Sequence, residues 1–267
     1  MKTFLRIYRA LFVAEFQAAA QYRVQSVLWL LFAIIRPLVF LAAWSAAAAA
    51  QGGSIGDLTM SDFAAYYVAL TLVGQLTMSW DAYDFEFDIR QGRLSSKLLR
   101  PLHPLNYAIV SNIVFKVTTL PVLLPALALM AWTFQARFGT QWWHLVLFLP
   151  CVVLAAALRF VFGWVMATLG FWTTRIHSIM HFYDRVQFLF AGQVAPLSLL
   201  PGALASIGYA LPFGYMLWAP AEILRGGTTV EQSLGLMAVQ VAWLAVSLTA
   251  YLVIWRVGIR QYSAVGA

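Results

Sequence analysis

Two histidines, His177 and His181, have the spacing that places two metal ligands on one turn of a helix. The zincin pattern needs Glu directly after the first histidine, and here that residue is Ser178. Cys151 is the only cysteine and lies in an apolar run, so there is neither a disulfide framework nor a cysteine-based zinc site. The sequence therefore predicts no metal site, and the role of the histidine pair stays open.

The sequence also gives no support for nucleotide or nucleophile chemistry. In a P-loop the lysine directly follows a glycine, whereas Lys2, Lys97 and Lys116 follow Met, Ser and Phe. A GxSxG pattern occurs at Gly52 to Gly56, but it lies in a glycine-rich connection between two predicted spans and not on the strand-to-helix turn that a nucleophile elbow requires. We therefore expect a non-catalytic chain that carries no cofactor of its own.

The composition places this chain in a bilayer. Of its 267 residues, 62% are hydrophobic and 10% are charged, and the mean hydropathy is +0.78. Soluble domains have roughly 45–50% apolar and roughly 25% charged residues. The net charge of +7 then favours cationic loops beside membrane lipids rather than a nucleic-acid partner.

Long apolar runs predict an all-α integral membrane protein with six spans, because about 20 apolar residues cross the hydrocarbon core and open sheets cannot. Five runs are long enough to be read directly, and a sixth follows from the parity of the crossings. The predicted spans cover residues 27–50, 63–83, 107–134, 142–172, 186–200 and 232–255.

The stretch from Val186 to Ala221 is uncharged but is interrupted by several prolines and glycines. We expect one span there, followed by a re-entrant hairpin over residues 201–221 on the outer face, where backbone outside a helix must be covered by protein or water. Two spans would separate Arg256 and Arg260 from the N-terminus.

The cations predict the orientation. With both termini cytoplasmic, twelve of the seventeen Lys and Arg residues lie inside, and only Arg137 and Arg225 lie outside. The inner set is Lys2, Arg6, Arg9, Arg23, Arg90, Arg93, Lys97, Arg100, Arg175, Arg185, Arg256 and Arg260.

Residues 1–20 have apolar and cationic arcs on a helical wheel, which predicts an amphipathic helix in the cytoplasmic interface. Glu15, Gln17 and Gln21 interrupt any signal-peptide core, so we keep this segment in the mature protein. A plain basic anchor and a functional element are both open readings of it.

The cytoplasmic loop Asp81 to Pro104 predicts a short two-faced helix over residues 88–101, after an acidic half on flexible turns. Arg90, Arg93, Lys97 and Arg100 would share one face, with Leu94 and Leu98 on a neighbouring arc. One reading is contact with anionic headgroups. The other is a docking helix with leucine anchors and a cationic rim for a cytoplasmic partner.

Three further cations, Arg36, Lys116 and Arg159, lie within predicted spans. Charge inside a membrane is costly, so such residues either pair or snorkel, or else line a transport path. Both readings are open here. Arg36 precedes Pro37, which predicts a kink.

The plan resembles the permease subunits of type-two ABC exporters. The resemblance in wording is closest to a branch of paired, uncharacterised ABC transport permeases, in which an early Tyr-Arg and an I-x-x-G-x-L-x-x-x-L-x-R-P-L loop recur. Here these motifs read Tyr22-Arg23 and Ile89 to Leu102. The topology extends over the whole chain, whereas the motifs occur at these two places.

This resemblance implies that the helix between spans two and three is a coupling helix seated on an ATPase subunit. The docking residues would be Ile89, Arg90, Gly92, Arg93, Leu94, Lys97, Leu98 and Arg100. It also implies that the segment Pro196 to Pro220 caps the exit of a pathway formed with a second permease, identical or different. ATP and Mg would be bound by the partner ATPase.

The resulting hypothesis is a permease subunit of an ATP-driven exporter in a bacterial inner membrane, moving a hydrophobic or amphiphilic drug, lipid or glycan by alternating access. An ion-driven secondary transporter is one alternative, although the two halves lack an obvious inverted repeat. A membrane enzyme acting on lipids, using His177, His181 and Asp184, is another.

Overall fold

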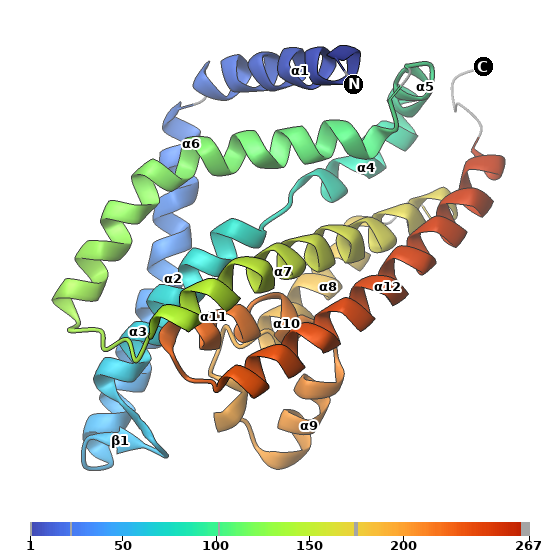
Figure 1. Cartoon of the computed structure of the whole chain (residues 1–267). Helices are drawn as coiled ribbons and strands as arrows, with labels where there is room; N and C mark the ends of the chain where they lie inside the picture. Colours follow the sequence, from blue (N-terminus) through green and yellow to red (C-terminus); the bar gives the residue numbers. More distant parts are fainter. Residues whose placement is uncertain (1, 22, 101, 174–175, 263–267) are drawn as a thin grey trace.

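The computed structural model describes residues 2–21, 23–100, 102–173 and 176–262, and within them the chain is almost entirely helical (Figure 1). The elements follow one another as α1 (Lys2–Gln21), α2 (Arg23–Ala50), β1 (Ser54–Ile55), β2 (Leu58–Thr59), α3 (Met60–Thr77), α4 (Asp81–Arg90), α5 (Arg93–Leu98), α6 (Pro104–Thr133), α7 (Trp142–Thr168), η1 (Leu169–Phe171), α8 (Ile176–Phe190), η2 (Leu197–Leu199), α9 (Gly202–Ala210), α10 (Phe213–Met216), α11 (Trp218–Arg225) and α12 (Val230–Gln261).

The molecule has two distinct ends. We call the end that holds α1, α5 and the last turns of α12 the terminal end, and the end that holds the β1–β2 hairpin and α9 the hairpin end (Figure 1). Ser95 of α5 and Tyr262 after α12 join two parts of the terminal end, with 3.1 Å between their hydroxyl oxygens. Both ends of the described chain thus lie at one end of the molecule.

Helix α3 is the centre of the bundle. Its residues from Phe63 to Leu70 are all buried, so the helix has no polar face turned to a solvent. It starts at a capping box in which Thr59 and Asp62 satisfy each other's backbone N–H groups. Tyr66 and Tyr67 of α3 donate to the carbonyls of Gly192 and Val194, each at 2.7 Å, and so hold the segment after α8.

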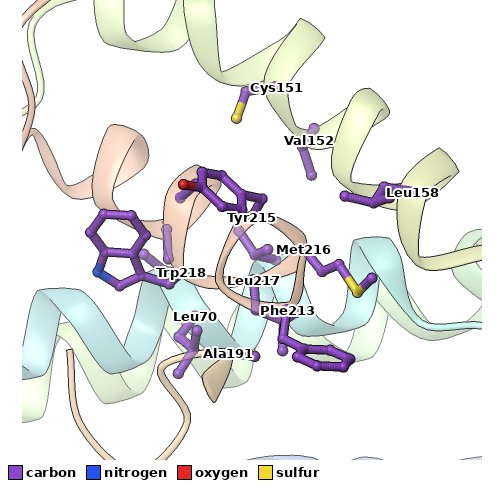
Figure 2. Close-up of a cluster of buried hydrophobic side chains, with 14 of the residues drawn as sticks. Leu70, Cys151, Val152, Leu158, Ala191, Phe213, Tyr215, Met216, Leu217 and Trp218 are labelled. Carbon is purple, nitrogen blue, oxygen red and sulfur yellow. The ribbon is translucent and has the colours of Figure 1, made fainter. Parts of the chain in front are cut away.

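The broken segment before α12 folds back into this core. Figure 2 shows apolar side chains of α10 and α11, among them Tyr215, Met216 and Trp218, between α3, which carries Leu70, and α7, which carries Val152. Gln240 of α12 donates to the carbonyl of Tyr215 at 2.8 Å, which ties α12 to α10. Burial of this apolar surface holds α10 and α11 in place although neither is long enough to be stable alone.

The two interhelical loops at the hairpin end are joined. The backbone N–H of Gly139, between α6 and α7, donates to the carbonyl of Arg225 at 2.9 Å. Arg225 and the buried Glu222 of α11 form an ion pair of 2.6 Å. Gly226 ends α11 at φ 83°, a conformation that suits glycine.

Four helices within the described residues are long and apolar enough to cross a bilayer: Leu31–Ala50, Pro104–Thr133, Trp142–Phe171 and Val230–Gln261. They coincide with predicted spans one, three, four and six. The second predicted span, 63–83, corresponds to α3, which has 18 residues and stops at Thr77. At about 1.5 Å per residue it is about 27 Å long, slightly less than the hydrocarbon core.

Residues 186–200, predicted as the fifth span, do not form one helix in the structure. The helix of this region is α8, Ile176–Phe190, and the chain leaves it through Gly192 at φ 79°. The prediction excluded the charged residues Asp184 and Arg185, whereas tertiary contacts accommodate Asp184 inside the bundle. The predicted hairpin 201–221 is three helices, α9 to α11, and extends to Arg225.

The predicted docking helix 88–101 is also corrected. The acidic half expected as turns is helix α4, and a break at Gln91 and Gly92 separates it from the six-residue α5. Gly92 has φ 67°, which reverses the chain direction between the two helices. The cations therefore do not share one continuous helical face, and Pro101 lies outside the described residues.

The predicted N-terminal helix 1–20 is present as α1. It lies against α6, where Tyr8 donates to Asn106 at 2.5 Å. Val13 and Phe16 remain exposed on α1, as suits a helix at a membrane interface.

Candidate transport cavity and docking segment

A cavity of about 300 Å³ lies among α2, α3, α4, α7 and α8. Its wall combines aromatic side chains with a few polar groups, and it contains two of the three cations predicted to lie in spans, Arg36 and Arg159. Mostly apolar walls with a small number of polar groups are typical of sites for small molecules, which usually occupy about 300–1000 Å³.

Arg159 of α7 is held by neutral acceptors. Its guanidinium donates to the carbonyl of Gly74 at 3.3 Å, to the Thr77 hydroxyl at 3.0 Å and to Oε1 of Gln187 at 3.3 Å. Gln187 is itself only 2% exposed. Three helices, α3, α7 and α8, therefore fix this charge without supplying a carboxylate from the described residues.

Arg36 of α2 lines the same cavity. Its guanidinium carbon is 5.7 Å from the centre of the Phe188 ring, which is within the range of a cation–π contact. The side chain is exposed, so it does not depend on the bundle for its position. The cavity thus brings together two cations more than a hundred residues apart in the sequence.

Lys116 of α6 is hydrogen-bonded to neighbouring residues within the bundle. Its ammonium group donates to the carbonyl of Met78 at 3.0 Å and to Oδ1 of Asn112 at 3.3 Å. Asn112 also donates to Asp81 at the start of α4. This network fixes the junction of α3 and α4 against α6, so Lys116 follows the pairing reading and is absent from the cavity wall.

Tyr83 connects the cavity to α4. Its hydroxyl donates to a carboxylate oxygen of Asp184 on α8, and both side chains line the cavity. Because α4 continues through Gly92 into α5, this hydrogen bond is a direct mechanical contact between the α4–α5 segment and the cavity wall.

The predicted docking residues have different environments. Leu94 is fully buried (0% exposed), so in this structure it anchors α5 on the bundle and presents no surface to a partner. Leu98 is 39% exposed and Leu99, which the helical pattern does not mark, is 89% exposed. Leu98 and Leu99 therefore form the exposed apolar surface at the end of α5.

Several charged residues of this segment interact with residues of the same chain. Buried Asp88 forms ion pairs with Lys97 and with Arg93, the latter at 3.8 Å. Burial, and then the carboxylate of Asp88, raise the pKa of Asp84. Arg100 lies 5.6 Å from the centre of the Tyr107 ring.

The remaining docking residues are less exposed or not described. Ile89 is partly buried against the core, and Gly92 forms the turn between the two helices. The side chain of Arg90 lies outside the described residues, as do Tyr22 and the side chain of Arg23 of the early Tyr-Arg motif.

The other sequence candidates do not assemble into a site. His177 and His181 are exposed on α8 with ring centres 6.3 Å apart, and within the described ranges no three His, Cys, Asp or Glu residues are grouped to hold a metal ion. Cys151 is buried and unpaired.

Residues that the sequence did not mark as functional prove central to the cavity, above all Gln187 and Tyr83. A polar residue within the apolar run Val186 to Phe190 is the signal that could have indicated Gln187. The Tyr83 contact has no such signal, because 101 residues separate it from Asp184.

Four apolar helices of membrane-spanning length among the described residues define a multi-pass membrane protein, and two of them, α2 and α7, line the partly charged cavity. A family model described as ABC-2 family transporter protein matches residues 28–266. The chain therefore belongs to the ABC-2 family of transporter permeases. The comparison with curated proteins yields no match. Permeases of this family are membrane subunits of ABC transporters, are normally non-catalytic and generally work with ABC ATPase partners.

Proposed function

We propose that this chain is the permease subunit of an ATP-driven exporter, and that its substrate passes through the cavity that holds Arg36 and Arg159. The observation that carries the proposal is the Tyr83–Asp184 hydrogen bond, because it joins the α4–α5 segment directly to the cavity wall. A partner that moves α5 would also move this wall.

In the proposed arrangement, α2, α3, α6, α7, α8 and α12 cross a bacterial inner membrane with both termini cytoplasmic. The broken segment α9 to α11 enters from the outer face as a re-entrant hairpin. The terminal end, which carries Arg93, Lys97 and Arg100, then faces the cytoplasm, in agreement with the positive-inside rule.

The proposed mechanism is alternating access. Two separate ATPase subunits close on ATP, α5 follows through Leu98 and Leu99, and α4 transmits the movement to the cavity wall. Arg36 is exposed and α2 covers little of its own surface within this chain, so a second permease, identical or different, would complete the pathway.

Co-purification tests this function. Tagged wild-type protein should retain a P-loop ATPase, and Leu98→Asp combined with Leu99→Asp should release it, since two carboxylates would then need desolvation at the interface. Phe138→Asp is the matched control, because this exposed residue lies in the loop at the hairpin end and should leave the partner bound.

The result also separates this function from the alternatives. If no ATPase accompanies the wild-type protein and a proton gradient drives transport in ATP-depleted vesicles, a secondary transporter replaces the proposal. If His177→Ala, His181→Ala or Asp184→Asn abolishes a lipid-modifying activity, an enzyme replaces it.

A further inference from the structure

The cavity wall contains more positive than negative charge. Among the described residues that line it, Arg36 and Arg159 are cations and Asp184 is the acidic side chain. Asp184 accepts its hydrogen bond from Tyr83, and neither arginine forms an ion pair with a described residue. An uncompensated guanidinium inside a membrane is costly, so an anion in the cavity would be strongly favoured.

The remaining wall suits an apolar tail. Phe40, Leu70, Phe188 and Leu217 line the same space as the two guanidiniums. A ligand that fits this wall has an apolar part and an acidic head, since arginine recognises carboxylate and phosphate through paired N–H donors.

The positions of the two arginines also separate their roles. Arg159 is fixed by three neutral acceptors from two other helices, so its charge is held in place before a ligand arrives. Arg36 is exposed and held only against the Phe188 ring among its described contacts, so it is free to reorient onto a bound head group.

From this arrangement we infer that the cavity selects an anionic amphiphile, with the phosphate or carboxylate head between Arg36 and Arg159 and the tail against the aromatic wall. This inference rests on the proposed function, because it takes the cavity as the substrate path. It excludes cationic amphiphiles, which the two guanidiniums would repel, although the aromatic side chains alone would accept them.

Binding of matched amphiphiles tests the inference. The full-length chain is placed in nanodiscs of phosphatidylcholine, which has no net charge, and is titrated with dodecyl phosphate, dodecyl maltoside and dodecyltrimethylammonium, which share one tail. Trp80 lines the cavity and the chain has eleven tryptophans, so the part of the fluorescence change that is lost in Trp80→Phe reports binding there. Dodecyl phosphate should bind at least about tenfold more tightly than the other two.

Variants localise the effect to the cavity. Arg36→Gln should weaken dodecyl phosphate binding at least about tenfold and leave dodecyl maltoside unchanged. Arg36→Lys should recover part of the affinity. Arg256→Gln removes an exposed charge of α12 outside the cavity wall and should change nothing. Arg36 is used rather than Arg159 because Arg159 also supports the packing of three helices.

Equal or tighter binding of dodecyltrimethylammonium, or equal losses in Arg36→Gln and Arg256→Gln, would overturn the inference. A minor fraction of phosphatidylglycerol in the nanodisc distinguishes the source of the anion. Competition with dodecyl phosphate identifies a membrane phospholipid, and lack of competition identifies a free amphiphile; both results support anion selection. The readout needs no ATPase, so loss of the proposed function through failed co-purification is a separate result.

Discussion

The hydrogen bond from Tyr83 to Asp184 offers the most direct test of how movement reaches the cavity. Tyr83→Phe removes the donor and keeps the ring, which also packs beside Trp80. A hydrogen bond to a charged group contributes about 1.5–3 kcal/mol, and its loss leaves the carboxylate of Asp184 without this partner. Since about 1.4 kcal/mol corresponds to a factor of ten, coupling between α4 and α8 should fall by about tenfold to about 150-fold.

The assay is transport per ATP hydrolysed by the assembled transporter in proteoliposomes. Tyr83→Phe should keep the bound ATPase and its basal hydrolysis, because α5 is unchanged, while transport and the stimulation of hydrolysis by substrate decrease. Tyr8→Phe is a matched control: it removes a hydroxyl that bonds Asn106 between α1 and α6, away from the cavity, and should leave transport per ATP unchanged.

A double-mutant cycle with Asp184→Leu isolates the pair, because each single substitution removes the hydrogen bond and leucine offers no replacement acceptor. The effects of the two substitutions should be non-additive by about 0.5–3 kcal/mol. Transport per ATP that matches the wild type in Tyr83→Phe, or additive effects of the two substitutions, would refute this reasoning.

Three further predictions concern the stability of the fold. Leu94→Ala should lower the free energy of unfolding by about 2–5 kcal/mol, whereas Leu99→Ala should lower it by less than about 0.5 kcal/mol; comparable losses on denaturant titration would contradict the assigned burial. Glu222→Gln should cost about 3–5 kcal/mol, because it leaves the charge of Arg225 unpaired, and a Tm equal to that of the wild type would show that the ion pair is dispensable. Gly226→Ala should lower the free energy of unfolding by more than about 1 kcal/mol, since φ is 83° and the added Cβ would meet backbone of the α6–α7 loop. A free energy of unfolding within about 0.5 kcal/mol of the wild-type value would contradict this.

The helical class and four long apolar helices followed from composition and run length, since a bilayer demands both. The same rule keeps charged residues out of a predicted span, so the fifth predicted span, 186–200, began after Asp184 and Arg185 and missed most of α8. That rule takes no account of a hydrogen bond from another helix, such as the one that Tyr83 of α4 donates to Asp184. Likewise Gly92 was visible in the sequence, but the break between α4 and α5 depends on a backbone conformation that helical periodicity does not encode.

The candidate site shows the same division. Sequence alone identified Arg36, Lys116 and Arg159 as costly charges and left two readings open for all three. Packing separated them, since Arg36 and Arg159 line one cavity while Lys116 bonds Met78 and Asn112. Depth along a helix can be counted from residues, but the direction of a side chain around the bundle depends on its neighbours.

The sequence by itself determined that this chain belongs in a membrane, is built of helices and lacks the motifs of ATP hydrolysis, because these properties depend on composition and on residues adjacent in the chain. Only the tertiary structure decided that Leu94 is an internal anchor, that Leu99 is exposed and that Tyr83 bonds a cavity residue 101 positions away. Burial and long-range hydrogen bonds arise from the packing of whole helices, so they follow from the fold and not from local pattern.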